Sequence, residues 1–222
     1  MKKLYMIFAL LIFVLLVGCS SDQSEASTDN KEEQNETTNT EENKKDNEED
    51  SQQNDRVLTE VGQTYEDELG TVELMKIKSI NETIDHGPLR IELLDAKILK
   101  RTNLSNDLFN HINQFSAIAE GEGFSYIQLR FNVENTGDLD LEWANVLNLV
   151  TDQKEQVDAF AQEFLMMDNK LDYLGNVEKE FTQGYVLEKP DINEVRLVFD
   201  SIRDIATYET LVEEKDYKFS FE

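Results

Sequence analysis

The feature that most constrains this chain is a strict alternation of apolar and polar residues over residues 124–134. The apolar members of the alternation are Ile127, Leu129, Phe131 and Val133. A period of two is the period of a β-strand with one buried face and one polar face. Residues 135–138, Asn-Thr-Gly-Asp, follow it and are typical of a hairpin turn. This stretch predicts an antiparallel β-sheet.

Similar short apolar patterns recur along the rest of the chain from residue 57. We expect further strands over residues 71–80, 89–99, 139–143, 146–150, 156–161, 177–187, 194–202 and 217–221. In the 139–143 strand, Leu139, Leu141 and Trp143 are expected to face the core. The alternation slips by one residue at Met75 and at Leu94, and each slip predicts a β-bulge. Many short strands separated by turns predict one mainly β domain, an antiparallel β-sandwich over residues 57–222.

One segment, residues 105–119, has a helical period instead. Its apolar residues are Leu108, Ile112, Phe115 and Ala119. Ser105 is a suitable N-cap, and Gly121 and Gly123 follow the segment, so we expect one short amphipathic helix inserted into the sandwich. The helix would either cap the sandwich or carry a binding surface. Phe109 lies beside the main apolar stripe, so it is a candidate anchor for a partner.

The chain begins MKKLYMIFALLIFVLLVGC, in which two lysines precede an apolar run from Leu4 to Val17. The run is shorter than the roughly 20 residues that a membrane-spanning helix needs, and it matches the core of a signal peptide. Residues 16–19, Leu-Val-Gly-Cys, resemble the lipobox of bacterial lipoproteins. The resemblance implies cleavage after Gly18 and a diacylglyceryl group on Cys19. An ordinary secretory signal and an uncleaved anchor helix are the alternatives.

Cys19 is the only cysteine of the chain. If it carries lipid, the mature protein has no disulfide and no cysteine metal site. Residues 20–56 contain one alanine as their only apolar residue, so they cannot bury enough surface to fold. We expect a signal peptide at 1–18, a disordered acidic tether at 19–56 and the β domain at 57–222. The tether is a solvated spacer or, alternatively, a cation-binding tail.

The formal net charge of −26 argues against a nucleic-acid partner, because phosphates are bound by lysine and arginine patches. The two histidines, His86 and His111, have no second histidine at zinc-ligand spacing. No nucleophile motif, phosphate loop or dinucleotide fingerprint occurs, so we expect no enzyme activity and no cofactor beyond the lipid.

The strongest cluster of possible ligands is Asp138, Asp140 and Glu142. On a strand, residues two apart share one face, and carboxylate oxygens are the ligands that calcium prefers. The alternative is an ordinary solvent face, and it is favoured because the glycine-centred calcium loop is absent.

Two segments also carry a resemblance to a known family. Phe131–Gly137 and Gly184–Pro190 are similar to strands of an immunoglobulin-like β-sandwich domain of unknown function found in Gram-positive lipoproteins. The similarity spans about residues 60–222, and the helical insertion near 104–121 departs from the family pattern. These motifs are structural, so the resemblance implies a fold and a lipoprotein class but no catalytic residue.

These observations predict a non-enzymatic lipoprotein anchored on the outer face of a Gram-positive cytoplasmic membrane. Its immunoglobulin-like domain would bind another envelope protein or an envelope component. The alternatives are a divalent-cation-responsive envelope module and, less favoured, a cell-envelope hydrolase. A two-lobed solute receptor is disfavoured by the length of the chain.

Overall fold

The structure is a computed structural model that describes residues 57–165 and 171–221. The signal peptide, Cys19 and the acidic tether lie outside these residues. Of the described residues, 56% are in strands and 7% in helices, so the predicted mainly β class is confirmed. Every strand pair is antiparallel. In the described part of the chain, no helix has the length and apolarity needed to span a membrane.

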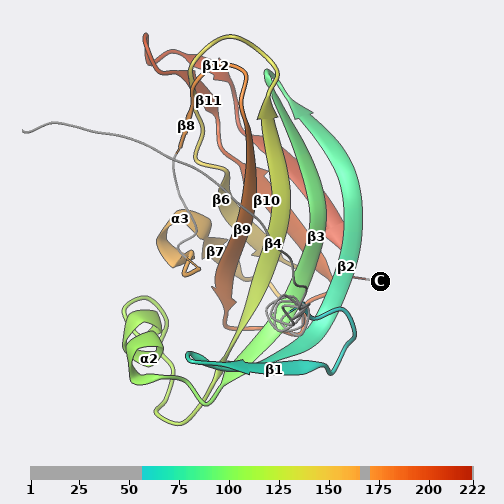
Figure 1. The fold of residues 1–222 in the computed structure, drawn as a ribbon, viewed down its shortest axis with the longest axis vertical. Coiled ribbons are helices and arrows are strands. Elements are labelled where there is room, and N and C mark those ends of the chain that lie inside the picture. Colours follow the sequence, from blue (N-terminus) through green and yellow to red (C-terminus); the bar gives the residue numbers. More distant parts are fainter. Residues whose placement is uncertain (1–56, 166–170, 222) are drawn as a thin grey trace, which may run out of the picture. The chain divides into compact units, whose positions relative to one another are not determined.

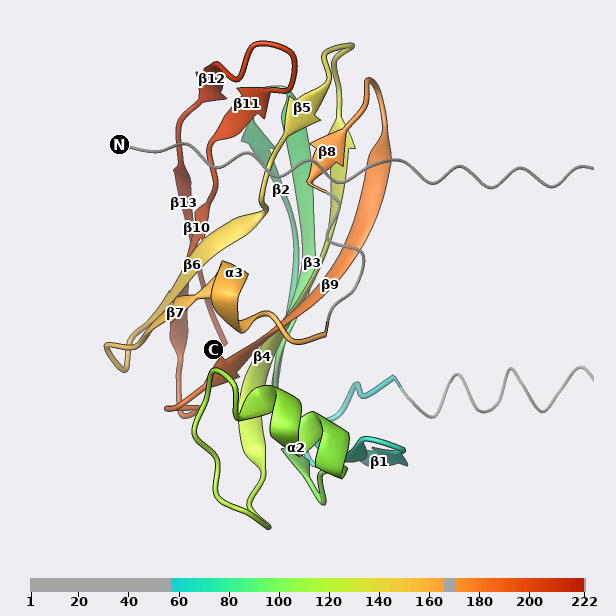
Figure 2. The same ribbon diagram turned by 90° about the vertical axis from the view of Figure 1, so that its left-hand side faces the viewer.

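The largest sheet has five strands in the order β1-β2-β3-β4-β9. Its members are β1 (Thr64–Asp67), β2 (Gly70–His86), β3 (Leu89–Thr102), β4 (Phe124–Asn135) and β9 (Glu178–Leu187). Its long strands curl into a half-barrel, which Figures 1 and 2 show from two sides.

Two four-stranded sheets complete the fold. One has the order β13-β10-β6-β7, and the other has the order β12-β11-β5-β8. Their members are β5 (Leu141–Glu142), β6 (Val146–Thr151), β7 (Gln156–Asp158), β8 (Asp172–Tyr173), β10 (Glu194–Phe199), β11 (Ile202–Asp204), β12 (Thr210–Val212) and β13 (Lys215–Ser220).

Both predicted bulges are confirmed. The pairing of β2 with β3 shifts between Leu74 and Lys76, and the pairing of β3 with β4 shifts between Leu93 and Asp95. A bulge adds one residue to a strand and reverses the faces that the following side chains occupy. Bulges also bend strands, which suits the strong curl of this sheet.

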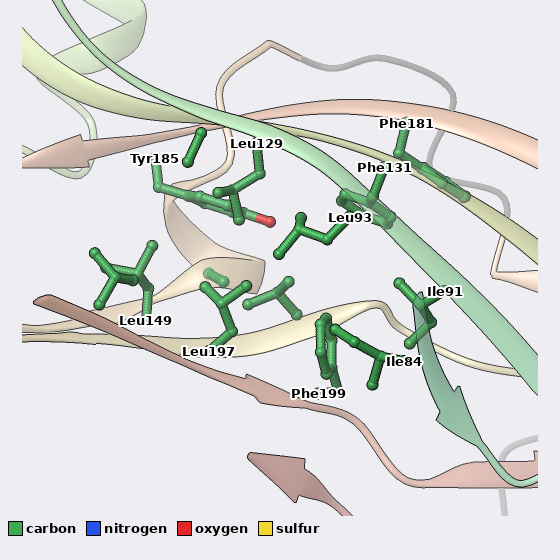
Figure 3. Close-up of a cluster of buried hydrophobic side chains, with 14 of the residues drawn as sticks. Ile84, Ile91, Leu93, Leu129, Phe131, Leu149, Phe181, Tyr185, Leu197 and Phe199 are labelled. Carbon is green, nitrogen blue, oxygen red and sulfur yellow. The ribbon is translucent and has the colours of Figure 1, made fainter. Parts of the chain in front are cut away.

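The concave side of the half-barrel encloses the main core, which we call the inner cluster. It joins residues of the large sheet, such as Leu93 and Phe131, to residues from the smaller sheets and the chain next to them. These include Trp143, which follows β5, and Leu197 and Phe199 of β10. Figure 3 shows these strands meeting through their side chains, with the Phe131 and Phe181 rings stacked at 5.1 Å between centroids.

A second core, the outer cluster, lies on the opposite face of the large sheet. It contains Leu58, Leu99 and Phe124, together with Leu108 and Ile112 from α2 (Asn106–Ile112). The predicted N-cap is confirmed, because the Leu108 N–H donates to Ser105 Oγ at 3.3 Å.

The helix is shorter than the sequence period indicates. It ends at Ile112, and the Asn113 side chain then accepts a hydrogen bond from the Ile118 N–H at 3.0 Å. This contact folds residues 113–118 into a loop. Phe115 still packs against the outer cluster, but Ala119 is exposed.

Several strand predictions need correction. The turn after Asn135 is not a hairpin, because β4 pairs with β3 and β9 while the chain passes to β5 in another sheet. Leu139 was expected in the core but is 54% exposed, since the strand begins only at Leu141. Leu141 and Trp143 are fully buried, as predicted.

In the later part of the chain, two predicted strands are each broken into two shorter elements. Residues 156–161 form β7 and then the short helix α3 (Ala159–Gln162), whose N-cap is Asp158. Residues 194–202 divide between β10 and β11. Strands β1, β8 and β12 were not predicted from the sequence.

Candidate functional site

A pocket of about 210 Å³ lies where α3 meets the start of β6 and the end strand β9. Figure 2 shows α3 in the opening between the β6–β7 strands and β9. We call this cavity the α3 pocket. Its lining consists of five apolar and four polar residues, namely Ala144, Asn145, Val146, Ala159, Phe160, Glu163, Leu171, Gln183 and Tyr185.

Asn145 supplies the first polar group. Its backbone has a φ of 66°, in the left-handed region, which asparagine tolerates better than most residues. The side chain is 2% exposed, and its Oδ1 accepts a hydrogen bond from the Tyr173 hydroxyl at 3.3 Å. The backbone carbonyl accepts from the Asp200 N–H at 2.9 Å. Asn145 is therefore fixed by contacts at both its backbone and its side chain.

Gln183 and Tyr185 supply the next two groups from the inner face of β9. The Tyr185 hydroxyl donates to Gln183 Oε1 at 2.7 Å, and both side chains are buried. Burial raises the pKa of Tyr185, and the negative charge of Glu163 raises it further. The hydroxyl therefore remains protonated at neutral pH, and it keeps the Gln183 amide in one orientation.

Within the described residues, the Asn145 and Gln183 side chains form hydrogen bonds through their oxygens. Three buried side-chain atoms of the described residues have no hydrogen-bond partner. They are Asp95 Oδ1, His111 Nε2 and Thr151 Oγ1. The two amide nitrogens are not in that set, and no described residue hydrogen-bonds to them. As far as the described residues are concerned, both amide N–H groups are left as donors on the pocket lining.

Glu163 supplies the carboxylate. Its Oε1 accepts from the Leu165 N–H at 2.9 Å and from the Gly184 N–H at 3.4 Å. The same segment pairs with the edge of β9, because the Phe164 N–H donates to the Gly184 carbonyl at 3.1 Å. The wall of the α3 pocket is therefore tied to β9 by backbone and side-chain contacts.

Gly184 makes this close approach possible. A Cβ atom at this position would lie 2.7 Å from Leu165 Cδ1 and 3.1 Å from Phe164 Cε1. The absence of a side chain lets the chain after α3 cross the edge of β9. Phe164 then packs on the outer cluster, edge-on to Phe124 and Tyr126.

The rim of the pocket carries an exposed aromatic ring. Phe160 on α3 is 72% exposed, while its neighbour Ala159 is buried in the inner cluster. The site thus combines two amide donors, one carboxylate acceptor, a protonated tyrosine and an open aromatic face.

The three acids considered for calcium do not form a cluster. Asp138 and Asp140 are exposed in the loop before β5. Glu142 Oε1 lies 3.6 Å from Arg203 Nη1 across the β5–β11 pair. Within residues 57–165 and 171–221, no group of three or more His, Cys, Asp or Glu side chains is placed to hold a metal ion.

Phe109 is half-buried rather than fully exposed. It lines a separate, shallow hollow of about 490 Å³ between α2 and the following loop, together with Asn106, Glu120 and Glu122. The hollow and the α3 pocket share no lining residue.

Both histidines have packing roles. His86 is 2% exposed, and its Nε2 donates to the Asp200 carbonyl at 2.7 Å. Its ring packs edge-on to Trp143, and burial lowers its pKa. His111 packs edge-on to Phe115 beside the outer cluster.

Sequence reasoning did not identify the α3 pocket, because its polar residues are far apart in the chain. Residues 163–174 matched neither a helical nor a strand period. One signal was present: Gln183 occupies an inner-facing position of its strand between Phe181 and Tyr185. A polar residue in such a position indicates a structural or functional requirement.

Comparison with known proteins leaves the function to be argued from this geometry. No protein-family model matches the chain. The "Uncharacterized protein YdhF" of Bacillus subtilis strain 168 is 27% identical over 189 residues, covering 82% of this chain and 78% of that protein.

Two solved structures are also similar. One is a functionally unknown protein from Listeria monocytogenes EGD-e, with a TM-score of 0.47 and 10% identity over 69% of this chain and 89% of that one. The other is a conserved hypothetical protein from Bacillus anthracis, with a TM-score of 0.36 and 13% identity over 56% of this chain and 92% of that one.

Proposed function

We propose that the chain is a lipoprotein, anchored through Cys19 to the outer face of the cytoplasmic membrane, whose β domain binds an envelope component without transforming it. The start of the chain supports the anchor, since a short apolar run ends in a lipobox-like Leu-Val-Gly-Cys. At about 0.8 kcal/mol per buried methylene, two acyl chains would hold the protein on a membrane.

We further propose that the domain is a variant of the immunoglobulin-like sandwich. Antiparallel sheets face each other across the inner cluster, and Trp143 is fully buried between them. A core tryptophan between two antiparallel sheets is typical of that architecture. The curl of the large sheet and the α2 insertion are the features that set this variant apart.

The α3 pocket is the observation that carries the binding role. The amides of Asn145 and Gln183 do not ionise at neutral pH, and the raised pKa of Tyr185 keeps its hydroxyl protonated. Glu163 is the one carboxylate among the described lining residues, which include no histidine or lysine that could complete an acid–base pair. Such a lining suits recognition.

The anchor is tested by metabolic labelling of growing cells with an alkyne-tagged fatty acid. We expect the wild-type chain and a Ser20→Ala control to be labelled equally and to sediment with membranes. The Cys19→Ala variant should incorporate no label. Label that persists in Cys19→Ala would refute the anchor.

The binding role is tested by co-sedimentation of the full chain, kept in detergent, with envelope material freed of membrane. We expect wild-type protein to sediment and Gln183→Met, which removes the amide but keeps the shape, to remain in solution. Phe109→Ala serves as the control because it lies outside the pocket. Equal sedimentation of all three proteins would reject the α3 pocket as the binding site.

A further inference from the structure

We propose that the α3 pocket holds one uncharged sugar ring of an envelope glycan. This inference rests on the proposed binding function and names the ligand class of the same site. It follows from the charge, the hydrogen-bonding groups, the aromatic rim and the size of the pocket.

The charge of the lining favours a neutral ligand. Among the lining residues that the structure describes there is no lysine or arginine, and the domain is rich in acids, so the described lining offers an anion no counter-charge. The one carboxylate, Glu163, already accepts hydrogen bonds from two backbone N–H groups. A cationic ligand would therefore compete with contacts that hold the pocket wall.

The hydrogen-bonding groups favour a ligand that both donates and accepts. Tyrosine hydroxyls hold the oxygen ends of Asn145 and Gln183, so these side chains present N–H donors to the cavity. Glu163 contributes a carboxylate acceptor to the same lining. A hydroxyl is the simplest group that satisfies both kinds of partner, because it has one donor and two acceptor lone pairs. A sugar ring carries several hydroxyls in fixed directions.

The aromatic rim provides a surface for the apolar side of such a ring. Phe160 is 72% exposed on α3, whose buried residue is Ala159. The ring is thus available to a ligand that enters between α3 and β9. Stacking a sugar ring on Phe160 would remove apolar surface of both partners from water.

The size of the pocket indicates a single ring. Its volume of about 210 Å³ corresponds to about seven water molecules and lies below the roughly 300–1,000 Å³ of pockets for drug-sized ligands. The cavity opens to solvent on one side. The rest of a glycan chain would therefore extend outward past Phe160.

Ligand-detected saturation-transfer NMR on the full chain in detergent tests this inference. The probes are the trimer of N-acetylglucosamine, maltotriose and the peptide Ala-Ala-Ala. We expect saturation transfer to at least one of the two sugars and none to the peptide. We expect Phe160→Ala to weaken sugar binding about tenfold and Gln183→Met to weaken it at least as much. Phe109→Ala is the matched aromatic control and should bind as the wild type does.

Phe160 is exposed, so its replacement should leave the urea midpoint unchanged and keep the result independent of folding. Absence of transfer to both sugars would overturn the proposal, and so would sugar binding that is equal in wild type and Phe160→Ala. Transfer to the peptide alone would overturn the sugar proposal and indicate a peptide ligand instead. If the sugars fail while envelope co-sedimentation still depends on Gln183, only this inference fails and the binding function stands.

Discussion

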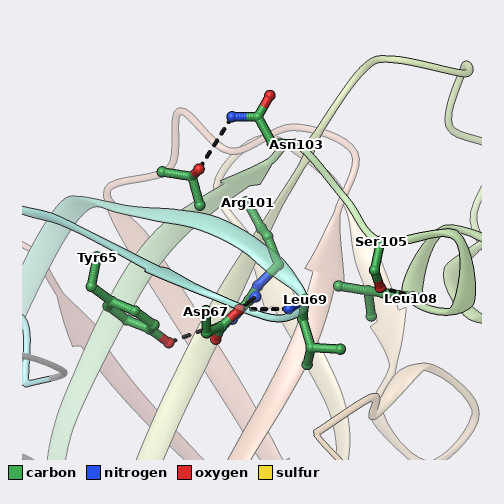
Figure 4. A network of polar contacts seen from close by, with 8 residues as sticks. Tyr65, Asp67, Leu69, Arg101, Asn103, Ser105 and Leu108 are labelled. Carbon is green, nitrogen blue, oxygen red and sulfur yellow. Dashed lines mark hydrogen bonds and ion pairs between the residues drawn. The ribbon is translucent and has the colours of Figure 1, made fainter. Parts of the chain in front are cut away.

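The ion pair between Asp67 and Arg101 fastens the edge strand β1 to the large sheet. Arg101 Nη1 lies 2.6 Å from Asp67 Oδ1, and Nη2 lies 3.1 Å from Oδ2. Figure 4 shows Arg101 and Asp67 side by side near Tyr65. The Tyr65 hydroxyl accepts from the same guanidinium at 3.4 Å. The Arg101 side chain is 5% exposed and the Asp67 side chain is 20% exposed. The pair is therefore largely shielded from water.

Asp67→Asn removes the charge of this pair while keeping its shape. Breaking a buried ion pair on one side costs about 3–5 kcal/mol, because the remaining charge is left uncompensated. The cost is smaller here, since Asp67 is partly exposed and the asparagine oxygen still accepts one hydrogen bond. We expect the free energy of unfolding to fall by about 2 kcal/mol.

The change is measured by urea unfolding followed through the fluorescence of Trp143. This residue is the only tryptophan and is fully buried, so its emission reports loss of the core. Glu66→Gln is the matched control, because it removes the same charge from the adjacent exposed residue. A loss below about 0.5 kcal/mol, or an equal loss in the control, would refute the reasoning.

A double variant sharpens the test. In Asp67→Asn with Arg101→Met, the Arg101 charge that Asp67→Asn leaves uncompensated is removed. We expect the double variant to regain part of the stability that Asp67→Asn loses, as found when buried pairs are replaced by apolar groups. Losses that simply add would show that the buried charge is not the source of the effect.

Three further predictions use the same unfolding assay. Burial raises the pKa of Asp67, but the contacts with Arg101 outweigh it and lower the pKa overall. The contribution of Asp67 is therefore complete above about pH 4 and is lost as pH falls through its lowered pKa, so wild type and Asp67→Asn should converge in acid. Ser105→Ala removes the N-cap of α2 and should cost about 1 kcal/mol. Gly184→Ala forces Leu165 to move and should cost about 1–3 kcal/mol, with weaker ligand binding.

The long strands were predictable because their apolar pattern extends over many residues. The slip at Leu94 located a bulge, since one extra residue moves every following side chain to the other face. The shortest strands had no such signal. β5 and β8 contain two residues each, and two residues do not define a period. Leu139 was misplaced for this reason.

The site was not predictable in the same way. Asn145, Glu163 and Gln183 come together through the curl of the large sheet and the position of α3, which are tertiary effects. The acidic run Asp138-Leu139-Asp140-Leu141-Glu142 looked more promising, because it concentrates charge in the sequence. In the structure Asp138 and Asp140 are exposed, and Glu142 lies beside Arg203. Local density of charged residues was therefore a poor guide to the pocket.

The α3 pocket and the protection of the β9 edge come from the same segment of chain. An open strand edge invites pairing with other chains, and Glu163 forms a β-bridge with Tyr185 that covers part of this edge. The bridge also brings the Glu163 carboxylate into the pocket wall. A change at Gly184 should therefore weaken edge protection and ligand binding together. A change at Phe160 should affect ligand binding alone, because its ring lies outside the bridge.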